Sequence, residues 1–149
     1  MDDFELVGIE TIARGVCIMD AHILLCAPKV GGDPRGAPSR TYLPGGHIEF
    51  KETGRQALIR EVKEELGLDA TTGKFLGVIE NQFVQKGKDH AEISLVYELN
   101  LVGGDPRGAP QAQEDWIQFI WWPVDKIKEA NLLPKEMENY VNGCCYSNV

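Results

Sequence analysis

The sequence lacks any apolar run that approaches the roughly 20 residues needed to cross a bilayer. It also lacks a basic and then apolar leader, because its first residues, Met1–Glu5, are rich in acidic side chains. We therefore expect a cytoplasmic protein that has no membrane as a partner.

Cysteines with the spacing of a metal site are missing too. None of the four cysteines forms a CxxC motif or a Cys/His pattern of the kind that binds zinc. Cys17 and Cys26 lie in apolar, strand-like runs, which predicts buried thiols, and Cys144 and Cys145 are adjacent near the C-terminal end. In a cytoplasmic protein all four would stay reduced.

Positive charge is scarce, since 15 Lys and Arg stand against 23 Asp and Glu, for a formal net charge of −8. This balance argues against a surface that wraps DNA or RNA, so we expect no nucleic-acid polymer as a partner. It is compatible with a small phosphorylated substrate if cations sit between carboxylates and phosphates. The length of 149 residues and the apolar fraction of 43% suit one globular domain, which we expect to span residues 1–149.

Hydrophobic patterns and turn signals divide the chain into strands and helices. The expected strands are Ile9–Met19, His22–Pro28, Lys74–Val84, Ala91–Leu101 and Ile117–Trp122, with a short extended piece at Arg40–Leu43. The expected helices are Gly54–Leu66, Val124–Ala130 and Pro134–Val141. Glu52 and Thr53 supply capping chemistry for the first helix, and Gly67 ends it. The pattern alone predicts an α/β or α+β protein with a mostly antiparallel sheet.

An octapeptide, Gly-Gly-Asp-Pro-Arg-Gly-Ala-Pro, occurs twice, at Gly31–Pro38 and at Gly103–Pro110. The flanking residues do not match, so this is no domain repeat. Asp-Pro-Arg-Gly suits a type I turn, and each copy joins two extended segments, which favours a loop. The alternative is that Arg35 and Arg107 both face a substrate cleft.

The first expected helix carries clustered acidic residues. Glu61, Glu64 and Glu65 stand at positions i, i+3 and i+4, which places them on one helical face. Three like charges repel one another, and hard divalent cations with oxygen ligands are the natural compensation. A cluster of this kind on its own is more often a solvated face. On the other side of the helix, the residues expected to pack against a sheet are Leu58, Ile59, Val62 and Leu66.

Two neighbouring features strengthen the hypothesis of a cation site. Arg60 can orient carboxylates through its planar donor fork. Pro44-Gly45-Gly46 is a turn signal just before the helix, and a glycine carbonyl there can act as a ligand because no side chain blocks the approach.

The complete spacing resembles the motif of the Nudix hydrolase family, G-x5-E-x7-R-E-U-x-E-E-x-G-U, where U is a bulky aliphatic residue. All nine fixed positions of this 23-residue motif are filled, by Gly46, Glu52, Arg60, Glu61, Val62, Glu64, Glu65, Gly67 and Leu68. The order of strands and the late Trp121-Trp122-Pro123 run also look like the family. The resemblance implies an α/β class protein with the Nudix fold, an α/β/α sandwich with a mixed β-sheet.

The resemblance also implies a metal site. Glu61, Glu64 and Glu65 would coordinate Mg²⁺, with Mn²⁺ as a substitute, near the carbonyl of Gly45. The family commonly adds an acidic residue from a late loop, and Glu114 is the candidate here, with Asp115 in reserve. A solvated loop charge is the even alternative for both residues.

Other residues receive roles in catalysis and substrate binding. Glu52 and Arg60 would brace the loop and helix, and Arg60 counts among the catalytic residues. Either Glu61 or Glu64 would accept the proton of the attacking water. The candidate substrate residues are His47, Glu49 and Phe83, and two further aromatic candidates are Trp116 and Trp121.

The implied reaction is magnesium-dependent hydrolysis of a pyrophosphate bond in a nucleoside diphosphate linked to another moiety. Residues 69–90 contain neither the proline nor the tyrosine that marks ADP-ribose or dinucleoside polyphosphate preference, so a nucleoside triphosphate or a nucleotide sugar is favoured. The alternatives are a catalytically silent nucleotide-binding module and an enzyme like isopentenyl-diphosphate isomerase, which would need a thiol facing the cleft. Many relatives are homodimers, and we expect one here.

Overall fold

The computed structural model describes residues 8–29, 38–105, 108 and 110–147, of which residues 145–147 are described in backbone only. Most of the first octapeptide copy, including Arg35, lies outside the described residues, as does Arg107 in the second copy. No helix in the described part of the chain is both long and apolar enough to cross a membrane.

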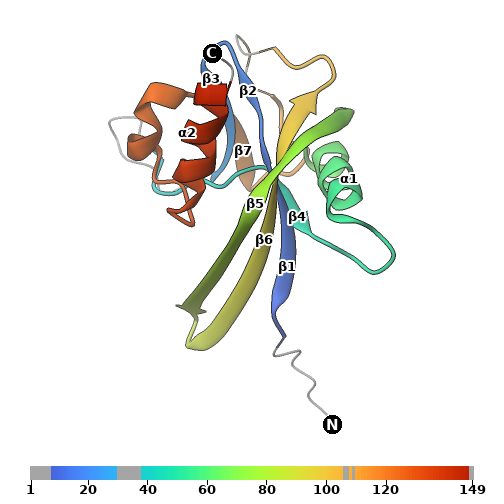
Figure 1. The fold of residues 1–149 in the computed structure, drawn as a ribbon, viewed down its shortest axis with the longest axis vertical. Coiled ribbons are helices and arrows are strands. Elements are labelled where there is room, and N and C mark those ends of the chain that lie inside the picture. Colours follow the sequence, from blue (N-terminus) through green and yellow to red (C-terminus); the bar gives the residue numbers. More distant parts are fainter. Residues whose placement is uncertain (1–7, 30–37, 106–107, 109, 148–149) are drawn as a thin grey trace.

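The strands form two sheets, shown in Figure 1. Their bounds are β1 Glu10–Val16, β2 Ile18–Met19, β3 His22–Pro28, β4 Gly45–His47, β5 Ala70–Gln85, β6 Lys88–Leu101 and β7 Ile117–Pro123. The first sheet has the order β4-β1-β6-β5 and is mixed, because β1 runs parallel to β6 and the other pairs are antiparallel. The second sheet, β2-β3-β7, is antiparallel.

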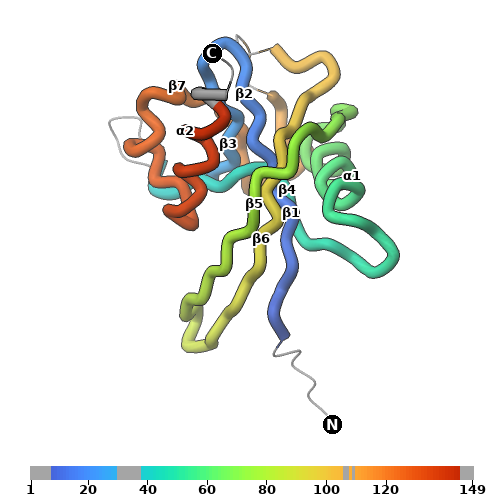
Figure 2. Tube along the Cα trace, in the orientation of Figure 1, coloured from blue at the N-terminus to red at the C-terminus, as the bar shows by residue number. Residues whose placement is uncertain are grey.

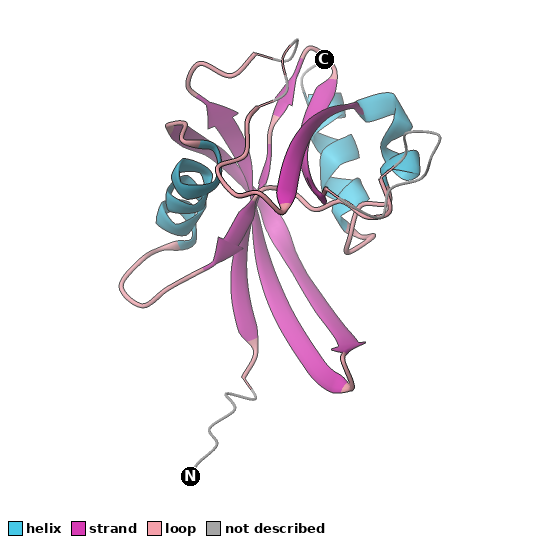
Figure 3. Ribbon diagram, turned by 180° about the vertical axis from the view of Figure 1, so that it is seen from behind, coloured by secondary structure: helices cyan, strands magenta, loops and turns pink. Residues whose placement is uncertain are grey.

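Helices cover the strands from two sides, as the view from behind in Figure 3 also shows. Helix α1, Gly54–Leu66, lies on one side, and the 3₁₀ segment η1, Val124–Ala130, and helix α2, Met137–Ser147, lie on the other. A separate cluster of buried apolar side chains underlies each side. This arrangement confirms the expected α/β/α sandwich with a mixed β-sheet.

Strand β3 explains how one strand serves both cores. Successive side chains in a strand point to opposite faces. Leu24 therefore joins the cluster beneath α1, while Ile23 and Leu25 join the cluster beneath α2. A continuous apolar run in the sequence thus marks a strand that is buried on both faces.

Helix α1 begins and ends where the sequence predicts. The Thr53 side chain accepts a hydrogen bond from the Gln56 backbone N–H, and the Gln56 side chain accepts one from the Thr53 N–H, which completes a capping box. Gly67 ends the helix in the left-handed conformation, with φ 69°. Ile59 differs from the expectation, because its side chain is 36% exposed instead of packing on the sheet. The helix buries a narrower stripe than its sequence suggests.

Two other expectations need correction. The expected strand Ile9–Met19 is broken after Val16, because its two parts pair in different sheets. Gly45 and Gly46 of the expected Pro44–Gly46 turn belong to β4, whose residues pair with β1. The short Arg40–Leu43 piece makes isolated β-bridges, one of which joins Tyr42 to Cys26, as expected for an extended segment.

The later elements also differ in type or length. Strand β5 begins at Ala70, four residues before the expected start, because the sheet register with β6 extends to Ala70↔Leu101. Residues 124–130 form a 3₁₀ segment with a kink at Lys126, and α2 begins at Met137 instead of Pro134. The paired β5 and β6 project well beyond the helices, as the Cα trace in Figure 2 shows.

Candidate active site

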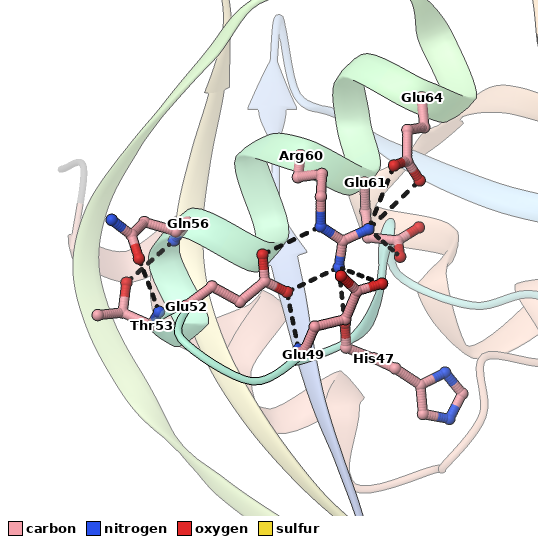
Figure 4. A network of polar contacts seen from close by, with 8 residues as sticks. All are labelled: His47, Glu49, Glu52, Thr53, Gln56, Arg60, Glu61 and Glu64. Carbon is pink, nitrogen blue, oxygen red and sulfur yellow. Dashed lines mark hydrogen bonds and ion pairs between the residues drawn. The ribbon is translucent and has the colours of Figure 1, made fainter.

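Arg60 is the centre of a polar network between α1 and the loop that precedes it (Figure 4). Its Nε and Nη2 atoms donate to the two carboxylate oxygens of Glu52 at 3.0 and 2.7 Å, and Nη2 also donates to the His47 carbonyl at 2.9 Å. Nη1 lies 3.3 Å from a carboxylate oxygen of Glu64. We call Glu52, Arg60, Glu64 and the His47 carbonyl the Arg60 cluster. The cluster fixes the loop to the helix, which is the bracing role predicted for Glu52 and Arg60.

The charges of the Arg60 cluster stabilise one another. Hydrogen bonds from Arg60, and then from the Glu49 backbone N–H, lower the pKa of Glu52 from its ordinary value. The hydrogen bond to Glu52 in turn raises the pKa of Arg60. The Glu49 side chain is largely exposed, with a carboxylate oxygen 3.8 Å from Arg60 Nη2. The network therefore favours the ionised form of Glu52.

A second acidic group faces the other way. The carboxyl groups of Glu61 and Glu65, one helical turn apart, lie within hydrogen-bonding reach of each other. Burial, and then the charge of Glu61, raise the pKa of Glu65 to about 8, while the nearby Arg14 opposes the rise. We call Glu61 and Glu65 the cleft pair. Near neutral pH the Glu65 carboxyl therefore tends to keep its proton, and a bound cation would favour loss of this proton.

Glu61 touches both groups, because its Oε1 atom also lies 3.1 Å from Arg60 Nη1. Glu64 does not join the cleft pair, since its side chain is 56% exposed and turned towards Arg60. The structure thus separates the three glutamates that the sequence places on one helical face. The reason is angular, because Glu61 and Glu65 are about 40° apart on a helix, whereas Glu64 and Glu65 are about 100° apart.

Two glycines allow the backbone to reach the cleft pair. A Cβ atom on Gly46 would lie 2.5 Å from the carboxyl carbon of Glu61, so the carboxylate packs directly on the bare backbone. Gly45 has φ 141°, and a Cβ atom there would overlap the carbonyl of Ala13. Arg14 Nη1 donates to the Leu43 carbonyl at 2.9 Å and lies 3.4 Å from the Gly45 carbonyl oxygen. The close approach predicted for Pro44-Gly45-Gly46 is therefore present.

The cleft pair opens into a cleft of about 410 Å³. Residues from β1, β3, β4, α1 and the start of β7 line it. The lining includes Arg14, Arg40 and Tyr42, for which the sequence predicted no role in a site. It also includes Cys26, which with Cys17 was a candidate for the cleft thiol of the isomerase alternative. Arg14 could have been recognised from the sequence, because an arginine inside the apolar run Ile12–Val16 places a charge on a buried strand. Burial lowers its pKa, which nearby Glu92 and Glu65 oppose.

The remaining predicted residues lie at different distances from this cleft. His47 lines it, and the His47 Nε2 atom lies 3.2 Å from a carboxylate oxygen of Glu10. Glu114 is close enough for its charge to raise the pKa of Glu65. Phe83 is elsewhere, because it stacks on His90 with ring centroids 5.0 Å apart and lines a separate hollow near the end of the β5–β6 hairpin. The structure does not bring Phe83 to the cleft.

The donor set of the cleft suits a hard divalent cation. Glu61 and Glu65 place carboxyl oxygens close together in the cleft, and a cation bound there would displace the proton that the raised pKa of Glu65 retains. The bare backbone of Gly46 lies directly against the Glu61 carboxyl group. In the described part of the chain, no three His, Cys, Asp or Glu side chains are already gathered as a complete metal site. Glu64 would have to leave Arg60 to complete one.

The fold is of the α/β class, with a mixed sheet between helices. Its acidic cleft lies beside β4, the strand that contains Gly45 and Gly46. The chain matches the model of the NUDIX domain over residues 10–142, and it belongs to this family. Members of the family generally use divalent metal cations, which agrees with the chemistry of the cleft pair.

Individual relatives agree with the family assignment. An ADP-ribose pyrophosphatase of Methanocaldococcus jannaschii is 38% identical over 72 residues, which cover 48% of this chain and 41% of that protein. A CTP pyrophosphohydrolase of Escherichia coli is 38% identical over 68 residues, which cover 46% of this chain and 47% of that protein. The chain thus spans less than half of the length of these relatives.

Solved structures show the same fold. A NUDIX hydrolase from Nitrosomonas europaea superposes with a TM-score of 0.70 at 21% sequence identity, covering 94% of this chain and 90% of that one. At this identity the likeness concerns the fold, which is therefore the expected Nudix fold.

Proposed function

We propose that this protein hydrolyses a pyrophosphate bond in a small nucleotide with the help of Mg²⁺. The observation that carries the proposal is the cleft pair, two carboxylates that share a partly buried cleft with Arg14 and the Gly45–Gly46 backbone. Family membership supports it, and both relatives described above are named for cleavage of such a bond.

The proposed ligands are Glu61, Glu64, Glu65, Glu114 and the Gly45 carbonyl. When bound, Mg²⁺ or Mn²⁺ supplies neutralisation of the phosphate charge and activation of a water molecule. Support is strongest for Glu61 and Glu65, which already share the cleft. For Glu64 to join them, its ion pair with Arg60 must open.

The protein's own side chains then perform three tasks. Arg60 holds Glu52 and the His47 carbonyl, and so fixes the loop against the helix that carries the glutamates. Arg14, at the wall of the cleft, places a cation beside the incoming phosphates. Glu61 accepts the proton of the attacking water. We prefer Glu61 to Glu64 as this base because Glu61 lines the cleft, whereas Glu64 is largely exposed.

The proposed substrate is a nucleoside triphosphate or a nucleotide sugar. The two relatives are named for one compound of each kind, CTP and ADP-ribose, so their names do not select between the two kinds. His47 and Glu49 remain proposed substrate residues at the rim. A cytoplasmic location, a homodimer and a single domain over residues 1–149 remain predictions.

Two alternative functions have different expected products. A silent binding module would release nothing, although this chain keeps all the glutamates of the motif. An isomerase of the isopentenyl-diphosphate type would rearrange carbon and release no phosphate. One observation favours the isomerase, because the Cys26 thiol lines the cleft; burial raises its pKa to about 12, so the thiol stays protonated at neutral pH.

A phosphate-release assay over nucleoside triphosphates, nucleotide sugars and isopentenyl diphosphate tests the proposal. We expect release of phosphate or pyrophosphate, or of a nucleoside monophosphate from a nucleotide sugar, with Mg²⁺ and none with chelator. Glu129→Gln makes the same Glu-to-Gln change at an exposed position of η1, away from the cleft, and should keep full activity. It is the matched control for Glu-to-Gln changes at Glu61 and Glu65. Isomerised product without release would favour the isomerase, and binding without any product would favour the silent module.

A further inference from the structure

Trp116 is a large apolar side chain that the fold leaves in solvent at the cleft. Its side chain is 68% exposed, yet it lines the same cleft as Glu61, Glu65 and Arg14. Exposed tryptophan is costly, because its rings carry a large apolar surface. An exposed aromatic residue in a cleft, unlike one on an open surface, therefore indicates a ligand with a flat apolar face.

The backbone holds Trp116 in this position. The Lys29 N–H donates to the Trp116 carbonyl at 3.2 Å, which extends the pairing of β3 with β7 by one residue. The next residue, Ile117, is buried in the core, and strand alternation then turns Trp116 outwards. Trp116 itself lies in the turn just before β7, and this hydrogen bond ties it to the residue that follows β3.

The three tryptophans differ in their hydrogen bonds. The indole N–H of Trp121 donates to the Gly108 carbonyl at 3.2 Å, and that of Trp122 donates to the Lys126 carbonyl at 2.7 Å. Within the described ranges the indole N–H of Trp116 has no such partner. Trp121 and Trp122 serve the structure, while both the face and the N–H of Trp116 remain available to a ligand.

We propose that Trp116 stacks against the base of the nucleotide and that base recognition here depends mainly on stacking. This inference rests on the proposed function, since it requires phosphates held beside Arg14 and the cleft pair. The cleft volume of about 410 Å³ lies within the usual range of roughly 300–1,000 Å³ for small-molecule sites. Stacking tolerates any base because every base has a π face. The substrate class is therefore nucleotides of several bases, with purines bound more tightly than pyrimidines because they stack over a larger area.

Steady-state kinetics of Trp116→Ala with ATP, CTP and inorganic tripolyphosphate test the inference. We expect KM for ATP to rise roughly 10-fold, within the range for loss of one base–aromatic stack, while kcat changes little. The rise should be smaller for CTP and absent for tripolyphosphate, which has no base. Trp116→Phe should keep most of the affinity. Phe50→Ala removes a fully exposed aromatic side chain that does not line the cleft, and should leave all three KM values unchanged.

Fluorescence gives a second readout that needs no turnover. ATP should quench the tryptophan emission of the wild-type protein, and Trp116→Phe should abolish most of that quenching while ATP still binds. If the wild-type protein hydrolyses no phosphoanhydride, the proposed function fails. If it is active but Trp116→Ala keeps its KM for ATP, or Trp116→Phe keeps the full quenching, then Trp116 does not stack on the base and the inference is wrong.

Discussion

The Arg60 cluster and the cleft pair use neighbouring residues of α1, Arg60 and Glu64 in the first and Glu61 and Glu65 in the second, yet the pKa shifts in the two groups are opposite. In the Arg60 cluster, hydrogen bonds from a guanidinium lower the pKa of Glu52. In the cleft pair, burial and a neighbouring carboxylate raise the pKa of Glu65 to about 8. The sequence shows only glutamates in both places, so the difference arises from the fold.

This difference separates structural from functional charge. The Glu52 carboxylate, which braces the loop, has a cationic partner inside the protein, whereas the buried Glu65 carboxyl keeps a proton near neutral pH unless a cation takes its place. Such perturbed groups in a cleft are typical of functional sites. Each prediction below changes one side of this comparison.

Removal of a cleft carboxylate should have the largest effect. Glu61→Gln and Glu65→Gln should each lower kcat by roughly 10²–10⁴-fold, because a cation ligand or a proton acceptor is lost while the shape is kept. Single-turnover kinetics with saturating Mg²⁺, together with circular dichroism, would measure the loss and check folding. Near-normal turnover in both folded variants would overturn the assignment of the cleft pair.

A smaller loss should follow when the cleft pair is displaced but not removed. In Gly46→Ala the new Cβ atom would meet the Glu61 carboxyl carbon at 2.5 Å and push this side chain aside. Misplacement of a catalytic group by about 1 Å costs on the order of 100-fold in rate, so we expect kcat to fall by up to that factor. A comparison with Gly143→Ala, which has open space around it, controls for the added methyl group. Equal activity of the two variants would show that contact between Gly46 and Glu61 has no catalytic role.

A change on the other side of the comparison should affect stability and activity together. Arg60→Ala leaves Glu52 and the His47 carbonyl without their donor, so the melting temperature should fall by a few degrees and kcat roughly 10-fold. Arg60→Lys keeps the charge but not the planar guanidinium. Its melting temperature and its kcat should therefore lie between those of Arg60→Ala and those of the wild type. Thermal unfolding with parallel kinetics measures both. If Arg60→Lys matched the wild type in full, the bidentate geometry would be irrelevant.

The smallest effects concern how the free energy of unfolding depends on pH, measured on protein from which metal has been removed by chelator. These effects distinguish the Arg60 cluster from the cleft pair most clearly. Glu65 has a folded-state pKa of about 8, above the ordinary 4.5, so the wild type loses stability as the pH rises from 4.5 to 8. Glu65→Gln does not titrate, and its stability relative to the wild type should therefore grow over this window.

Glu52 should behave in the opposite way. Its pKa is lowered in the folded protein, so its contribution is present above pH 4.5 and disappears as the pH falls through the folded-state value. Glu52→Gln should thus be less stable than the wild type at pH 7, with a smaller difference at low pH. Urea unfolding at several pH values tests both variants. If Glu52→Gln and Glu65→Gln changed the free energy of unfolding at pH 8 in the same direction relative to the wild type, the comparison would be contradicted.

Local signals allowed the helix and its charges to be predicted from the sequence. Thr53, Gln56 and Gly67 set both ends of α1 because capping depends on neighbours in the chain. The complete spacing of glutamates and glycines identified the family and therefore the fold. These features need no knowledge of how distant segments meet.

Features that depend on tertiary contacts were not predictable in the same way. Glu64 shares a helical face with Glu61 and Glu65 by spacing, but its side chain pairs with Arg60 of the same helix, whose guanidinium is held by Glu52 and by the His47 carbonyl. Phe83 was assigned to the substrate from its residue type, whereas the β5–β6 register places it beside His90 at a separate hollow. Arg14 received no role because its partners are backbone carbonyls about thirty residues away.

A crystal structure with Mg²⁺ and a non-hydrolysable nucleotide analogue would test the central claim most directly. The account predicts at least one cation coordinated by Glu61 and Glu65 beside the Gly45 backbone, in contact with the phosphates. An analogue bound in the cleft, with the two carboxyl groups still close together and no cation beside them, would contradict it.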